Sequence, residues 1–87
     1  MKVAVWDTYV TRQDGRVMNF DIMVPESETD DKIIYAYGRQ YLATKGLEDH
    51  PLTTKECSYC HVEIATDTMI ADIQKKGYSI VEIKNCQ

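Results

Sequence analysis

Two of the three cysteines and one of the two histidines of this chain stand within five consecutive positions. The run reads Cys57-Ser58-Tyr59-Cys60-His61, which has the C-x-x-C-H spacing of covalent haem attachment, while C-x-x-C alone marks redox pairs and zinc half-sites. We do not expect haem, because its attachment normally follows export and the N-terminal residues show no export signal. We do not expect redox exchange either, because the first thiolate would need a helix N-terminus and the residues after the motif predict a strand.

Zinc is the stronger chemical alternative, because two thiolates and an imidazole supply three ligands. Cys57, Cys60 and His61 would bind the ion, with Cys86 or His50 as the fourth ligand. On a regular strand Cys60 points away from Cys57 and His61, so a turn or bulge between the two cysteines would be required. We favour ordinary packing, with Cys60 as a small buried hydrophobe and Cys86 as a free thiol. The sequence therefore predicts no cofactor, with zinc as the alternative.

Two carboxylates form the other candidate constellation. Asp7 and Asp21 lie on segments that we expect to pair as a hairpin around Asp14-Gly15, so that they would stand roughly opposite one another. Two close carboxylates can raise one pKa and mark a site. A small enzyme using Asp7, Asp21 or His61 is one hypothesis, but no nucleophile or glycine-rich phosphate loop accompanies the acids. We favour solvated strand acids and assign no catalytic residue.

Composition and charge exclude several functional classes. The 87 residues predict one domain, residues 1–87, that can bury a core without disulfides or metal. Ten Lys and Arg against fourteen Asp and Glu give a net charge of −4, which opposes binding to nucleic acid. No segment has the length of a membrane span. We expect a cytoplasmic protein with reduced thiols.

The hydrophobic pattern predicts six elements in the order β-β-α-β-α-β. They are strands over 2–10 and 16–24, a helix over 30–45 capped by Ser27 or Thr29, a strand over 55–65, a helix that is capped by Thr66 or Asp67 and runs to 76 before Gly77, and a strand over 78–84. Alternation in the second strand predicts that its core-facing residues are Met18, Phe20, Ile22 and Val24. Gly38 is expected where the first helix approaches the sheet closely. The last three elements predict parallel strands with a right-handed crossover. The expected fold class is therefore a two-layer α/β (α+β) sandwich, with a mixed four-stranded sheet and both helices on one face.

Three segments resemble a known protein family. They are Lys2-Val3-Ala4-Val5-Trp6-Asp7-Thr8-Tyr9-Val10, Ala36-Tyr37-Gly38-Arg39-Gln40-Tyr41-Leu42 and Lys55-Glu56-Cys57-Ser58-Tyr59-Cys60-His61. Together they look like domain-of-unknown-function family 2024, a group of small bacterial proteins, and the resemblance covers nearly the whole chain. It implies a compact α/β domain from a bacterium. That family has no established activity, so the resemblance implies no catalytic residue.

Two helices on one face of a sheet leave the other face uncovered. On that face we expect Val17, Met23, Tyr59 and His61, together with one side of the first strand. A monomer rarely leaves a partly hydrophobic surface of this kind open. We therefore predict a non-enzymatic interaction or regulatory domain that forms a C2 homodimer through its sheet faces or binds another protein. The alternative is a zinc-binding or thiol-redox module built on Cys57, Cys60 and His61, with Cys86 as a further candidate.

Overall fold

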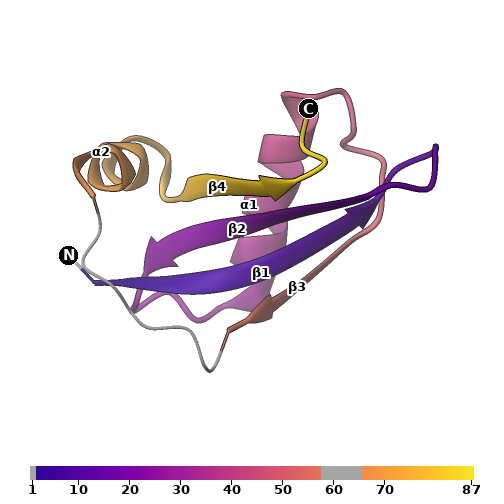
Figure 1. Ribbon diagram of the computed structural model, residues 1–87. Helices are drawn as coiled ribbons and strands as arrows, with labels where there is room; N and C mark the ends of the chain where they lie inside the picture. The colour runs from indigo at the N-terminus through magenta and orange to yellow at the C-terminus, as the bar shows by residue number, and fades with distance from the viewer. Residues whose placement is uncertain (1, 58–65) are drawn as a thin grey trace.

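A β-hairpin forms the centre of the protein in the computed structural model, which describes residues 2–57 and 66–87. Its strands are β1 (Val3–Thr11) and β2 (Val17–Pro25), and they pair antiparallel along their full length (Figure 1). Alternate residues of β2 are fully buried because they face the main core; they are Met18, Phe20, Ile22 and Val24. The predicted hairpin and its predicted core face are therefore confirmed.

The sheet has four strands in the order β3-β1-β2-β4, and every neighbouring pair is antiparallel. β3 (Leu52–Glu56) pairs with β1, and β4 (Ser79–Lys84) pairs with β2. The predicted mixed sheet and parallel crossover are wrong, because the two outer strands bind different members of the hairpin and lie at opposite edges. β3 also begins earlier than expected and ends at Glu56. Residues 58–65 of its predicted range lie outside the described residues.

The helix α1 (Asp31–Ala43) packs closely against the sheet. Asp30 is its N-cap, accepting a hydrogen bond from the Lys32 N–H at 3.0 Å, where we had expected Ser27 or Thr29. Gly38 permits the close approach, since a Cβ built there would lie 3.1 Å from Leu52 Cδ2 and 3.4 Å from Ile22 Cδ1.

The helix α2 (Asp67–Lys76) packs on the opposite face of the sheet from α1. Its N-cap is Thr66, one of the two predicted candidates, and it ends at Gly77, which has φ 94°. Its buried Ile73 belongs to a cluster with Val3 and Met23, whereas α1 packs on the main core cluster. The expectation of both helices on one face is therefore wrong. The physical reason is that the hairpin carries apolar residues on both faces at one end, and α2 covers those that α1 cannot reach.

Figure 1 shows the resulting arrangement, with α1 crossing behind the sheet and α2 beside the end of β4 near the N-terminus. Among the described residues no helix is long and apolar enough to cross a membrane. The face of the sheet turned away from α1 is thus covered by α2 at one end only.

Candidate functional site on the open sheet face

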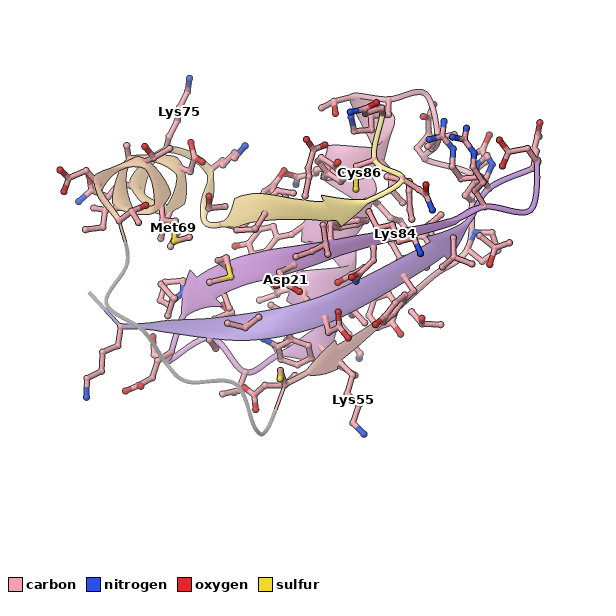
Figure 2. The ribbon with its side chains drawn as sticks, in the orientation of Figure 1. Asp21, Lys55, Met69, Lys75, Lys84 and Cys86 are labelled. Carbon is pink, nitrogen blue, oxygen red and sulfur yellow. The ribbon has the colours of Figure 1, made fainter. Side chains whose placement is uncertain are left out.

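The uncovered part of this face carries both charged and apolar side chains. We call it the open face and define it by Asp7, Tyr9, Val17, Asn19, Asp21, Ile83 and Lys84. Of these, Tyr9, Val17 and Ile83 are 45%, 43% and 55% exposed, which makes them three of the four exposed large hydrophobic residues in the described part of the chain. Figure 2 shows Asp21 and Lys84 on the same side of the sheet. A concentration of apolar exposure on one face is typical of an interaction surface.

Asp7 and Asp21 stand directly opposite each other at the centre of the open face. The register type follows from the hairpin end, where the Arg12 N–H donates to the Arg16 carbonyl at 2.8 Å and marks a hydrogen-bonded pair. Hydrogen-bonded and non-hydrogen-bonded pairs alternate along an antiparallel ladder. Asp7 is an odd number of residues from Arg12 along β1, so Asp7 and Asp21 form a non-hydrogen-bonded pair. Such pairs hold their side chains closest, with Cα atoms about 4.5 Å apart. The predicted opposition of the two carboxylates is confirmed.

Asn19 organises the polar centre of the open face. Its Nδ2 donates to Asp7 Oδ1 at 2.9 Å and to the Thr8 carbonyl at 3.0 Å. Burial, together with the charge of Asp7, raises the pKa of Asp21 above its ordinary value. A hydrogen bond to Asp7 raises the pKa of the Tyr9 hydroxyl. The negative charges of Asp7 and Asp21 therefore favour a proton or a cation near Asp21.

Sequence reasoning did not identify Asn19 as part of the site. The available signal was an asparagine in the interior of a strand, where this residue type is depleted. Its amide satisfies Asp7 but leaves Asp21 without a donor among the described residues. The imbalance between the two carboxylates was visible only once the register was known.

Replacing Asp21 with asparagine is expected to stabilise the monomer at pH 7 by about 0.5 kcal/mol, because like charges directly opposite on a sheet are destabilising. The folded-state pKa of Asp21 is raised, so the stability linked to its protonated form is present below the unfolded pKa. That stability is lost as pH rises through the folded pKa. The advantage of the variant should therefore shrink on acidification. Urea unfolding at low protein concentration, at neutral and acidic pH, measures both effects.

Asp14→Asn is the matched control for that substitution. Asp14 forms an exposed ion pair with Arg16 at 2.7 Å, and the hydrogen bonds from Arg16 lower its pKa. Its removal should leave stability unchanged or slightly reduced, as for most surface pairs. An Asp21→Asn variant that is less stable than the unmodified monomer at pH 7 would show that the two carboxylates do not repel each other.

The four residues expected on the interaction surface have different positions. Val17 lies on the open face, but Met23 is only 6% exposed because it lies beneath α2. Tyr59 and His61 lie outside the described residues. Met23 is buried because α2 packs on this end of the sheet face, where no helix had been expected.

The proposed metal ligands are not brought together where the structure describes them. Cys57 follows β3, and its N–H donates to the Val5 carbonyl at 2.9 Å. Cys86 is buried in the main core, and its Sγ donates to the Asn19 carbonyl at 3.2 Å. Val5 pairs with Met23, four residues from Asn19 along β2, so about 13 Å of strand separates the two attachment points. Cys86 is therefore not placed to share a metal ion with Cys57.

The other candidate metal ligands are Cys60, His61 and His50, and they form no metal site among the described residues. Cys60 and His61 lie outside the described residues, and His50 precedes β3 in the loop after α1. Within 2–57 and 66–87, no group of three or more His, Cys, Asp or Glu residues could hold a metal ion. Cys57 is disulfide-bonded and Cys86 is a free thiol. The expectation that all thiols are reduced is therefore wrong for Cys57.

Comparison with known proteins agrees with the fold. A family model described as a domain of unknown function (DUF2024) matches residues 1–83. The chain is similar to protein NE1680 from Nitrosomonas europaea, known from an NMR structure, with 34% sequence identity, full coverage of both chains and a TM-score of 0.80. No curated protein matches the chain. The comparisons thus establish an α+β fold and attach no activity to it.

Proposed function

Since the chain belongs to the DUF2024 family, whose description names no activity, we propose from its geometry that it is a non-enzymatic protein-interaction domain. The open face is the interaction surface, and its partner is a second copy of the chain related by a C2 axis. This assignment rests on one observation: a destabilising carboxylate pair stands among exposed apolar residues on a sheet face that α2 leaves uncovered.

The carboxylate pair supports a functional interpretation because it conflicts with local stability. Two aspartates in the closest cross-strand register repel each other, and burial already raises the pKa of Asp21. Features that break a local rule of stability tend to occur at functional sites. The pair therefore favours a partner that supplies positive charge.

A second copy of the chain supplies that charge. Lys84 borders the carboxylates on the open face, and in β4 it pairs with Asn19 of β2. A C2 axis through the open face would set Lys84 of each copy against Asp21 of the other, since each surface contacts its own equivalent. The same arrangement would bury Tyr9, Val17 and Ile83 from both copies.

Sedimentation velocity over a concentration series, from about 10 µM to about 1 mM, tests the dimer directly. Val17→Lys is expected to weaken dimerisation at least about tenfold, because it places a charge in the apolar part of the interface. Ile33→Lys is the matched control: Ile33 is 37% exposed, close to the 43% of Val17, but it lies on α1. It should leave dimerisation unchanged.

A charge exchange tests the proposed pairing. Lys84→Glu alone should weaken the dimer, and combining it with Asp21→Lys should restore much of the loss, because the opposite charges then meet again across the axis. An unmodified protein that stays monomeric at about 1 mM would refute the second copy as partner. Equal effects of Val17→Lys and Ile33→Lys would refute the open face as the contact.

The alternative function, a zinc or thiol-redox module, depends on Cys57, Cys60, His61 and Cys86. Among the described residues the structure separates Cys86 from Cys57, as shown above, and so removes one of the fourth ligands considered for zinc. The open face is our preferred site because its carboxylates, Lys84 and exposed apolar residues lie on one described surface.

A further inference from the structure

A cavity of about 290 Å³ opens between α1, α2 and β4, away from the open face. We call it the α1–β4 cavity; its lining includes Tyr41, Thr44, Asp72, Lys76, Tyr78 and Glu82. Tyr41 packs on Phe20 with ring centroids 4.6 Å apart, and Phe20 pairs with Glu82, so the part of the cavity lined by Tyr41 and Glu82 is on the α1 side of the sheet. Its volume is at the small end of the roughly 300–1,000 Å³ typical of ligand sites. A ligand would therefore be a small molecule.

Two carboxylates of this cavity are fixed by hydrogen bonds. Glu82 Oε2 accepts from the Tyr41 hydroxyl and from Lys45 Nζ, the latter at 3.2 Å. Asp72 Oδ2 accepts from Ser79 Oγ at 2.9 Å. Among the described residues the second oxygen of each acid, Oε1 and Oδ1, has no hydrogen-bond donor. Both acids thus keep acceptor capacity for a ligand.

The cation of this cavity is Lys76. Its Nζ lies 4.9 Å from the centroid of the Tyr78 ring. Lys45 is paired with Glu82, whereas Lys76 has no ion pair within the described residues. The cavity therefore combines an ammonium group that has no ion pair among the described residues with two carboxylates.

We propose that the α1–β4 cavity binds a small zwitterion of the free amino acid class. The ligand carboxylate would bind Lys76, and its ammonium group would bind the free carboxylate oxygen of Glu82. A ligand with only negative charge would meet both carboxylates, and one with only positive charge would meet Lys76 and Lys45. Only a molecule that carries both charges complements all of these groups.

The test is a set of ¹H–¹⁵N NMR titrations of the full chain with each of the common amino acids up to about 10 mM. At least one amino acid should give saturable shifts at the amides of the cavity lining. Acetate and methylammonium, which carry one charge each, should give none over the same range. Val17→Lys should retain the binding, since that residue lies on the open face, and so the result is independent of the proposed dimer.

Lys76→Gln is expected to raise the Kd of that amino acid at least about tenfold, and Lys76→Arg should retain most of the affinity. Lys75→Gln is the matched control, because it removes the same charge from the same turn of α2, and Figure 2 shows Lys75 extending away from the rest of the protein. The spectra of the free variants establish that each is folded. The proposal is overturned if no amino acid gives saturable shifts, if acetate binds equally well, or if Lys75→Gln weakens binding as much as Lys76→Gln.

Discussion

Replacing Ile73 with alanine is expected to lower the free energy of unfolding by about 2–4 kcal/mol, the range for truncating a buried isoleucine. Ile73 is the one buried residue in α2, and it packs with Val3 and Met23. Truncation removes apolar contacts and leaves a cavity beneath α2, which the helix can close only by shifting toward the sheet. The second cluster therefore depends on this side chain.

Urea unfolding, with the midpoint and slope compared between variants, measures this effect. Ile70→Ala is the control on the same helix, because Ile70 packs on the cluster but is only partly buried; its loss should cost less than half as much. Equal costs for the two truncations would contradict the assignment of Ile73 as the anchor of α2.

Gly77→Ala is expected to destabilise the fold by about 2–4 kcal/mol, from a positive φ and a steric overlap together. Gly77 ends α2 with φ 94°, a conformation that costs a residue with a side chain about 1–2 kcal/mol. A Cβ at this position would also collide with the Tyr37 hydroxyl and lie 3.0 Å from Tyr37 Cζ. Tyr37 cannot move freely, because it stacks on Tyr78 with ring centroids 4.5 Å apart.

Gly46→Ala separates the two contributions. Gly46 has φ 70°, but a Cβ there would meet nothing within 4 Å, so this variant should show the conformational cost alone, about 1 kcal/mol. Thermal or urea unfolding of both variants gives the difference. Tyr37→Phe removes the colliding oxygen and should recover part of the loss in the Gly77→Ala background. A Gly77→Ala variant that is no less stable than Gly46→Ala would show that the overlap is relieved without cost.

Local patterns in the sequence determined much of this fold. Strict alternation in β2 predicted its core face, and the Asp14-Gly15 turn predicted the hairpin. Once a short turn fixes the register, it also places Asp7 opposite Asp21. The sequence also predicted the helix end at Gly77, the close approach at Gly38 and Thr66 as one of two caps for α2. Each of these features is decided by residues near one another in the chain or by a single steric requirement.

Long-range pairing decided what the sequence could not. The outer strands could join either edge of the hairpin, and the choice depends on contacts between residues far apart in the chain, such as that between Leu52 and Gly38. The pairing of β3 with β1 and of β4 with β2 made the sheet fully antiparallel and separated Cys86 from Cys57. It also placed α2 over Met23, which limited the open face to the part around Asp21. The role of Asn19 and the α1–β4 cavity could be identified only from the tertiary structure. Their residues come from different strands and helices, which only the packed structure brings into contact.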